Sequence, residues 1–445
     1  MAIIMKFGGT SLGDAEKIKN AAQIVKSQIK RKPVVVVSAV SKITDMLIRL
    51  ANESAKGRGY SRDNLLSNIK NIHNQILEKL GIDEGLLKND IEELSNLSGK
   101  SKYVKNFGSN AKIFDLFQSF GERISSKIVA ARLNKIGIRA KALNSWELGF
   151  LTNSEFGNAE PLEISYSNIK NSIKKIDTVP VITGFIGKTE QGEITTLGRG
   201  GSDYTASIFG SAISAEEIQI WTDVDGIMSS DPKIVSDART IAKVSFAEAS
   251  ELAYFGAKVL HPKTILPAMK RRIPVKVLNS FNPKGKGTSI LSKTQKSEKT
   301  VKAISCKKNI TLINIESTRM LGAYGFLAKL FDIFSRHRKS VDVVATSEVS
   351  VSLTLENGGS LEDAMEELKG IADIKVYKNK SIICVVGEGI NSAVNIPGRT
   401  FSALAKNNIR AEMISMGASE INITFIVDGK DTDKAVKVLH GEYFG

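Results

Sequence analysis

Cysteine is scarce in this chain, which contains only Cys306 and Cys384 among its 445 residues. Two cysteines that both fall in strand-like segments can build neither a disulfide framework nor a cysteine metal site. We therefore expect a reducing compartment, which favours a cytoplasmic location. No group of acidic residues, histidines and cysteines has the spacing of a metal site, so the sequence predicts no metal ion held by the protein alone.

Long apolar runs are also absent, because no segment approaches the ~20 residues that span a bilayer. The apolar opening, residues 2–5, runs directly into Lys6 and is too short for the core of a signal peptide. The net charge of +15 is scattered, without a basic block or the interleaved aromatic residues of nucleic-acid-binding motifs. We expect neither membrane nor nucleic acid as a partner. The charge indicates a solvated basic surface or, alternatively, attraction of small anionic substrates.

Residues 1–290 alternate between strand-like and helix-like segments, which is typical of an α/β domain. The β-branched run 33–39 predicts a strand buried on both faces. We therefore expect a mainly parallel sheet sandwiched by helices, with a helical excursion over about 56–108. Further strands are expected at 3–7, 139–143, 179–185, 217–221 and, as the last strand, 274–278. Helices are expected at 14–29 and 202–213, the second capped by Ser202.

The glycine-containing residues 282–287 and the polar run 292–300 predict a linker after this domain. Beyond it, short strands and helices follow a pattern that occurs twice, so we expect two ferredoxin-like α+β units of βαββαβ order, at 301–378 and 379–445. The second unit lacks its closing strand, whereas the strand-like residues 301–306 have no place in the first. We hypothesise that this segment completes the second unit.

Four clusters of glycine, lysine and aspartate follow the predicted strands, at 6–10, 196–203, 221–226 and 255–262. Ligands of open α/β sheets bind beyond the carboxyl ends of the strands, so these clusters are expected to meet. Glycines let backbone amides approach phosphate oxygens, and an arginine such as Arg199 can bind a carboxylate. One glycine pair alone would indicate only a tight turn. Together the four clusters predict phosphoryl transfer.

These clusters, in this order, resemble the amino-acid kinase superfamily and are most similar to its aspartokinase branch, above all at 6–11, 198–203 and 222–226. The resemblance covers essentially the whole chain, and the two C-terminal units resemble tandem ACT domains. It implies transfer of the ATP γ-phosphoryl group to the β-carboxylate of L-aspartate, the first step toward lysine, threonine and methionine. A carboxylate is already ionised at neutral pH, so this chemistry needs alignment and charge neutralisation rather than a general base.

Matching positions in the resembled family imply roles for individual residues. Catalysis is implied for Lys6, Asp203 and Lys258, with Asp203 ordering the lysines. ATP contacts are implied for Lys6, Gly8, Gly9, Thr10, Thr222, Asp223, Asp231, Lys233 and Lys258, with Mg²⁺ carried by the nucleotide. Aspartate contacts are implied for Ser38, Thr44, Glu122, Phe185, Arg199 and Ser202. Arg199 would bind the α-carboxylate and Glu122 the α-ammonium group.

Several of these residues have an ordinary structural alternative. Glu122 could form a salt bridge with Arg123 or Lys127 on the surface of a helix. Asp203 could simply interact with the dipole of the helix that it begins, and Lys258 could be solvated. The chain also departs from a common family pattern, since Met228 stands where an aromatic residue is frequent and Lys233 where arginine is frequent.

The first C-terminal unit resembles the effector region of lysine-sensitive aspartokinases, so an amino-acid effector, first of all lysine, is implied. The matching residues are Met320, Gly322, Tyr324, Phe326, Leu327, Ser340, Val341, Asp342, Thr346, Ser347 and Glu348. Asp342 or Glu348 could face a cationic amine. Ordinary packing between strand and helix is the alternative interpretation. ACT units pair at sheet edges, so a homodimer or a larger homo-oligomer is expected.

Two other classes of function stay open at this point. The chain could phosphorylate glutamate, N-acetylglutamate or a nucleoside monophosphate, or it could be a non-catalytic amino-acid sensor. Glu122 favours a substrate with a free amino group, and the retention of Lys6, Arg199, Asp203 and Lys258 favours an enzyme. No homoserine dehydrogenase segment follows Gly445, so we expect a monofunctional kinase.

Overall fold

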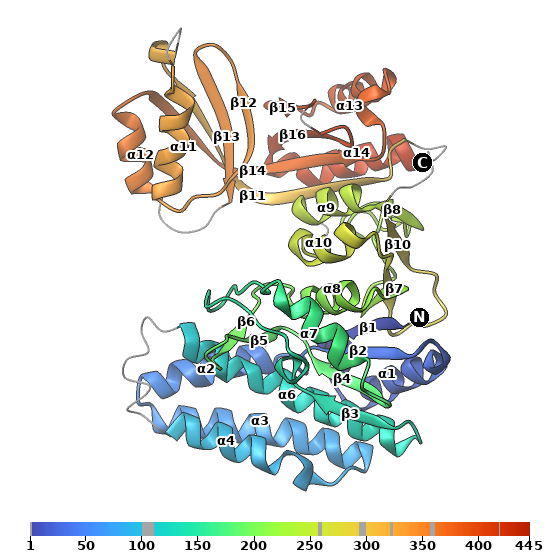
Figure 1. Cartoon of the computed structure of the whole chain (residues 1–445). Coiled ribbons are helices and arrows are strands. Elements are labelled where there is room, and N and C mark those ends of the chain that lie inside the picture. Colours follow the sequence, from blue (N-terminus) through green and yellow to red (C-terminus); the bar gives the residue numbers. More distant parts are fainter. Residues whose placement is uncertain are drawn as a thin grey trace. The chain divides into compact units, whose positions relative to one another are not determined.

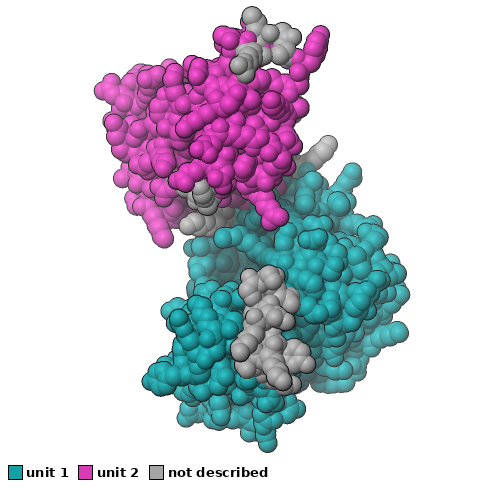
Figure 2. Space-filling model, turned by 90° about the vertical axis from the view of Figure 1, so that its left-hand side faces the viewer, with its two compact units in different colours: residues 1–227, 242–246, 259–293 teal, residues 228–241, 247–258, 294–445 magenta. Residues whose placement is uncertain are grey.

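The structure is a computed structural model that describes residues 2–99, 111–256, 260–292, 300–320, 324–356, 361–417 and 419–445. The chain divides into two compact units (Figures 1 and 2). The first unit consists of 1–227, 242–246 and 259–293, and the second of 228–241, 247–258 and 294–445. In these described ranges no helix is long and apolar enough to cross a membrane.

The first unit is built on an eight-stranded sheet of order β3-β4-β2-β1-β7-β9-β10-β8. The strands are β1 (Ile3–Phe7), β2 (Pro33–Val37), β3 (Ala140–Leu143), β4 (Val179–Thr183), β7 (Glu217–Thr222), β8 (Lys243–Ser245), β9 (Val275–Asn279) and β10 (Thr288–Leu291). All pairs are parallel except β9 with β10. The expected α/β class with a mainly parallel sheet is confirmed. The expectation that 274–278 is the last strand was wrong, because β10 folds back onto β9.

Helices cover both faces of this sheet. Alternate residues of β1 point to opposite faces, and Ile3, Met5 and Phe7 join the hydrophobic core that the helices α1 and α6 bury. Ile4 faces α8, which approaches the sheet closely because Gly210 lacks a side chain. The helices are α1 (Ala15–Ser27), α2 (Ile43–Ala55), α3 (Gly59–Leu80), α4 (Lys88–Gly99), α6 (Ala111–Lys135), α7 (Ile164–Ile173), α8 (Gly201–Ile213) and α10 (Pro262–Arg271).

The ends of these helices follow local chemistry in part. Asp14 caps α1, since its carboxylate accepts a hydrogen bond from the Lys17 amide at 3.0 Å. The expected cap of α8 was wrong: Gly200, with φ of 71°, precedes the helix, and Ser202 lies inside its first turn.

In its described part the expected helical excursion consists of α3 and α4, which pack with α2 and α6 (Figure 1). A small hairpin, β5 (Ile186–Lys188) and β6 (Ile194–Thr196), leads to the glycine-rich loop. Short 3₁₀ helices are η1 (Gly9–Leu12), η2 (Ile29–Arg31), η3 (Glu84–Leu87) and η5 (Ser145–Leu148).

The second unit contains a six-stranded antiparallel sheet of order β12-β13-β11-β14-β16-β15. Its strands are β11 (Ala303–Glu316), β12 (Val341–Thr346), β13 (Ser350–Glu356), β14 (Asp373–Val386), β15 (Met413–Ser415) and β16 (Asn422–Asp428). Its helices are α11 (Phe326–Arg336), α12 (Glu362–Lys369), α13 (Asn395–Lys406) and α14 (Thr432–Phe444), with the 3₁₀ helices η6 (Thr318–Met320), η7 (Ile390–Ser392) and η8 (Gly429–Asp431). Helix α9 (Phe246–Tyr254) packs mainly with this unit.

The two long strands β11 and β14 are shared by two similar halves of this sheet. Each strand is 14 residues long and contains an asparagine of positive φ, Asn309 in β11 and Asn379 in β14. Residues 303–307 pair with the second half of β14, beside β16, whereas 310–316 pair with β13 and with the first half of β14. Each half has its own hydrophobic core. The segment before Asn309 thus occupies the position of a fourth strand in the C-terminal half.

Candidate active site

Lys6 and Asp203 meet at the carboxyl end of β1. Lys6 lies two residues after Ile4 and therefore points to the same face of the sheet, toward α8. Its Nζ lies 2.5 Å from Oδ1 of Asp203, which belongs to the first turn of α8. The two side chains are only 10% and 13% exposed. A largely buried ion pair holds the lysine in one direction, as an ordering role for the aspartate would require.

Of the two glycines after β1, Gly9 leaves no space for a side chain. A Cβ on Gly9 would lie 2.9 Å from the Ala39 carbonyl oxygen, and a Cβ on Gly8 would lie 3.6 Å from the Lys6 ammonium nitrogen. The Gly8 amide already donates to the Trp221 carbonyl at 3.1 Å. The first amides of η1, which includes Gly9 and the exposed Thr10, are therefore better candidates for phosphate contacts than the Gly8 amide.

Glu122 approaches the same rim from the other side of the sheet, on α6. Its side chain is buried, and Oε1 accepts a hydrogen bond from the Ala39 amide at 3.0 Å. Oε2 has no hydrogen-bond partner among the described residues. Burial raises the pKa of Glu122 to about 8, although the Ala39 amide and the positive charge of Lys6 act in the opposite direction. Without a cationic partner the protonated acid is thus favoured at neutral pH, and a cationic group at the unpartnered oxygen would stabilise the carboxylate.

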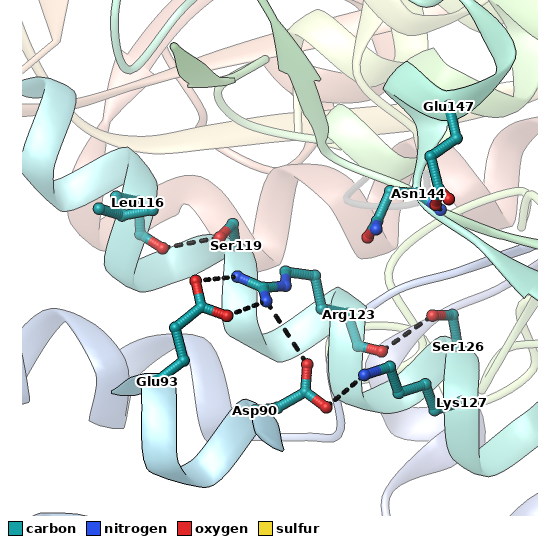
Figure 3. Close-up of polar contacts among 9 residues, drawn as sticks. All are labelled: Asp90, Glu93, Leu116, Ser119, Arg123, Ser126, Lys127, Asn144 and Glu147. Carbon is teal, nitrogen blue, oxygen red and sulfur yellow. Dashed lines mark hydrogen bonds and ion pairs between the residues drawn. The ribbon is translucent and has the colours of Figure 1, made fainter. Parts of the chain in front are cut away.

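The alternative interpretation of Glu122, a salt bridge with Arg123 or Lys127, does not describe this structure. Both cations contact acidic residues of α4 instead (Figure 3). Residues 122 and 123 point about 100° apart on a helix, so the two charges face different neighbours.

Three further residues predicted for the aspartate site, Ser38, Phe185 and Ser202, lie close together. The Gly184 amide donates to the Val37 carbonyl, and a Cβ on Gly184 would come within 2.7 Å of the Ser202 Cβ. Phe185 has φ of 67°, an unusual value for an aromatic residue, and its amide donates to Thr205 Oγ1 at 3.0 Å. Ser38 follows β2 directly, and Thr44 is half-buried at the start of α2. These residues line the ends of β2 and β4.

Arg199 is exposed in the loop before α8. Its neighbours Gly198 and Gly200 have φ of 74° and 71°, which favours glycine at both positions. The pKa of His261 is lowered, first by burial and then by the charges of Arg199 and Lys263, so Arg199 lies near the start of α10. Within the described ranges its guanidinium pairs with no carboxylate. It therefore remains available for an anionic ligand.

The predicted nucleotide residues are divided between the units. Thr222 ends β7, and its hydroxyl donates to Asp223 Oδ1 at 3.1 Å. Asp231 and Lys233 belong to the second unit, where the Lys233 amide donates to Asp231 Oδ1 at 2.9 Å and both side chains are exposed. Met228 accepts a hydrogen bond from the Thr240 hydroxyl. Lys258 lies outside the described residues. In the part of the chain that the structure describes, no three acidic, histidine or cysteine side chains gather as a metal site.

Sequence reasoning missed one buried acid near the glycine-rich loop, Asp115. It accepts hydrogen bonds from the Gly157 amide at 2.8 Å and from the Thr196 amide and hydroxyl at 2.8 and 2.7 Å. Burial raises its pKa. It thus holds the end of β6, just before Gly198, against α6. An aspartate inside the apolar run 113–117 was the available signal.

The residues predicted for the effector lie at two opposite ends of one half-sheet. Val341 is level with Leu355, and Thr346 is level with Val351. Ser340, Val341 and Asp342 therefore lie at one end. Met320, at the end of η6, lies with Thr346, Ser347 and Glu348 at the other. Tyr324 is fully exposed, Leu327 is exposed, Phe326 is half-buried and Gly322 lies outside the described residues. Five strand residues span roughly 17 Å, so one chain does not bring the two groups together.

Asp342 already has two partners in the chain. Its carboxylate accepts from the Tyr254 hydroxyl at 2.7 Å and from the Lys307 ammonium at 2.9 Å. Lys307 also pairs with Glu356 at 2.6 Å. One of the two side chains expected to face a cationic amine is thus occupied by a lysine of the same chain.

Comparison with known proteins matches residues 1–279 to the amino acid kinase family and residues 383–443 to an ACT domain. Aspartokinase 1, chloroplastic, of Arabidopsis thaliana is 41% identical over 459 residues, covering 99% of this chain and 80% of that protein. Lysine-sensitive aspartokinase 3 of Escherichia coli is 36% identical over 453 residues, covering 99% of both. Escherichia coli aspartokinase III in complex with aspartate and ADP has a TM-score of 0.85 at 34% identity, and the form in complex with lysine and aspartate has 0.81 at 35%, each over 100% of both chains.

The chain belongs to the amino acid kinase family. The full-length relatives and the matching ACT domain place it, within that family, among the aspartokinases. The family resemblance drawn from the sequence is thereby confirmed.

Proposed function

We propose that this protein transfers the γ-phosphoryl group of ATP to the β-carboxylate of L-aspartate and releases ADP and 4-phospho-L-aspartate. The observation that carries the assignment of the substrate is the buried carboxylate of Glu122, which has an unpartnered oxygen at the rim where Lys6 and Asp203 meet. A substrate that brings an ammonium group into that position satisfies the carboxylate. An N-acetylated substrate has no such group.

The reaction forms a bond between a β-carboxylate oxygen and the γ-phosphorus while the bond from that phosphorus to the β,γ-bridging oxygen breaks. Negative charge spreads over the phosphoryl oxygens in the transition state. Lys6 is directed by Asp203 toward this charge, and Lys258 is proposed to be the second lysine. Bound Mg²⁺ would be held chiefly by phosphate oxygens and water.

Recognition of aspartate is proposed to use two opposite charges. Arg199, which is exposed between two glycines of positive φ, binds the α-carboxylate with its planar fork. Glu122 binds the α-ammonium group, and Ser38, Thr44, Phe185 and Ser202 complete the site. For the nucleotide we propose the amides of Gly9 and Thr10, with Gly8 allowing close approach beside them, and the side chains of Thr222, Asp223, Asp231 and Lys233.

Release of ADP, followed with aspartate, glutamate, N-acetylglutamate and a nucleoside monophosphate, tests this assignment. We expect turnover with aspartate and little with the other three. A preference for N-acetylglutamate would contradict the role of Glu122. If the wild type and Lys6→Ala released ADP equally, both only at the background rate, a non-catalytic amino-acid sensor would be favoured.

We further propose inhibition by an amino acid, first of all lysine, and assembly into a homodimer or a larger oligomer in the cytoplasm. β12 forms one edge of the six-stranded sheet. A second copy paired at that edge in the opposite direction would bring its Asp342 toward the first copy's Thr346 and Ser347. Analytical ultracentrifugation should therefore find a dimer or larger, whereas a monomer at micromolar concentration would contradict the assembly.

A further inference from the structure

Helix α6 carries opposite charges in two directions. Glu122 points to the end of β2, where it contacts the Ala39 amide. Arg123 and Lys127, one helical turn apart, point instead toward α4 (Figure 3). The same helix thus holds a substrate-facing acid and two cations within six consecutive residues.

Asp90 of α4 is the centre of these contacts. It is 1% exposed, forms an ion pair with the Lys127 ammonium and lies 3.6 Å from Nη2 of Arg123. Glu93 binds the same guanidinium through both oxygens, at 2.5 and 3.2 Å. The guanidinium also lies 4.3 Å above the ring of Phe120. Figure 3 shows the two acids on one helix and the two cations on the other.

The burial of Asp90 makes this arrangement costly to disturb. If either cation turned away, a buried carboxylate would lose a partner, and breaking such a pair costs about 3–5 kcal/mol. The more exposed Glu93 exerts a weaker constraint. Asp90 therefore favours the orientation in which both cations point toward α4.

We propose that Asp90 is a positioning residue for aspartate binding, acting through Arg123 and Lys127. By binding both cations it keeps Glu122 directed at the substrate and prevents a neighbouring cation from occupying its free oxygen. The proposal rests on the proposed function, because it requires Glu122 to bind the substrate ammonium group.

Asp90→Asn tests this role, since it removes the charge with little change of shape. We expect the KM for aspartate to rise about tenfold or more, with the KM for ATP within about twofold of the wild type. A purely structural role would lower the fraction of active enzyme, and hence the apparent kcat. It would not raise the KM for aspartate while leaving the KM for ATP unchanged. Equal changes in both KM values, or none, would overturn the proposal.

Three variants serve as controls. Leu94→Ala removes a fully buried side chain of the same helix, so it should lower the Tm and leave the KM for aspartate unchanged. Glu93→Gln should change that KM less than about twofold, because the residue is half exposed. The triple variant Asp90→Asn, Arg123→Gln, Lys127→Gln removes both cations that Asp90 holds away from Glu122 and should restore the KM. A high KM for aspartate in a folded triple variant would contradict the proposal. This result can be read even if Asp90→Asn alone fails to fold.

The wild type separates this inference from the proposed function. If the wild type does not phosphorylate aspartate, the proposed function is wrong. If it does, and Glu122→Gln raises the KM for aspartate while Asp90→Asn does not, only the role of Asp90 is wrong.

Discussion

The two units place their predicted site residues very differently. In the first unit, Lys6, Ser38, Glu122 and Ser202 come from four separate segments and lie at one rim of one sheet. In the second unit, the predicted effector residues belong to one half-sheet but lie at its two opposite ends.

The direction of the strands explains this difference. In a parallel sheet the carboxyl ends of the strands lie at one edge, so residues that follow strands meet whatever their distance along the chain. In an antiparallel sheet successive strand ends alternate between the edges. In the second unit, residues that are close in the sequence therefore need not share a site. In the first unit, motifs that are far apart in the sequence do meet.

The largest expected effect concerns the rim of the parallel sheet. Lys6→Met should lower kcat about a thousandfold or more, because it removes a directed positive charge from the transferring phosphoryl group. Steady-state kinetics and the Tm measure the effect, with Lys17→Met, a change on the exposed side of α1, as the matched control. A loss of less than about tenfold would show that Lys6 does not act on the phosphoryl group.

The next effect concerns the glycine-rich loop at the same rim. Arg199→Ala should raise the KM for aspartate at least ~100-fold, since a charge-assisted bidentate contact is worth a few kcal/mol. Lys263→Ala is the control, because Lys263 also lies near His261 but pairs with Glu160. An unchanged KM in Arg199→Ala would remove this residue from the aspartate site.

In the second unit a smaller effect is expected at Asp342. Lys307→Met removes the cation that already occupies this carboxylate, so lysine should inhibit at concentrations about fivefold lower, which corresponds to about 1 kcal/mol. Dose–response curves at fixed ATP and aspartate measure the shift. Asp342→Asn should move the curve to higher lysine concentration, and identical curves for all three proteins would exclude Asp342 from the effector site.

The smallest effect is on stability and depends on pH. The pKa of Glu122 is raised to about 8 by burial, so folding favours its protonated form. The stabilisation that protonated Glu122 gives to the folded state is complete below the unfolded pKa of 4.5 and is lost as the pH rises through about 8. The Tm of Glu122→Gln minus the Tm of the wild type, both measured without substrate, should therefore increase from pH 5 to pH 8.5. A constant difference over this range would contradict a buried, titrating carboxylate.

Local patterns in the sequence predicted much of the fold. Strand-like segments gave the positions of β1, β2 and β7, and the helix expected from residue 14 corresponds to α1, which Asp14 caps. β10 could not be recognised, because four residues of alternating burial have little signal without the partner strand β9.

The candidate site shows the same limit. Motifs of glycine and charged residues in the sequence are sufficient to predict Lys6, Arg199 and Asp203 as site residues. The buried acids Asp90 and Asp115 were missed because their importance comes from partners distant in the sequence. The Gly8 amide was expected to bind phosphate, yet its contact with Trp221 depends on the pairing of β1 with β7.

The most direct test of the account traps the acyl phosphate. Wild-type protein incubated with ATP, Mg²⁺, aspartate and hydroxylamine should form aspartyl hydroxamate in proportion to the ADP released, and Lys6→Met should form almost none. ADP release without hydroxamate, or equal hydroxamate from both proteins, would contradict phosphoryl transfer to a carboxylate at this rim.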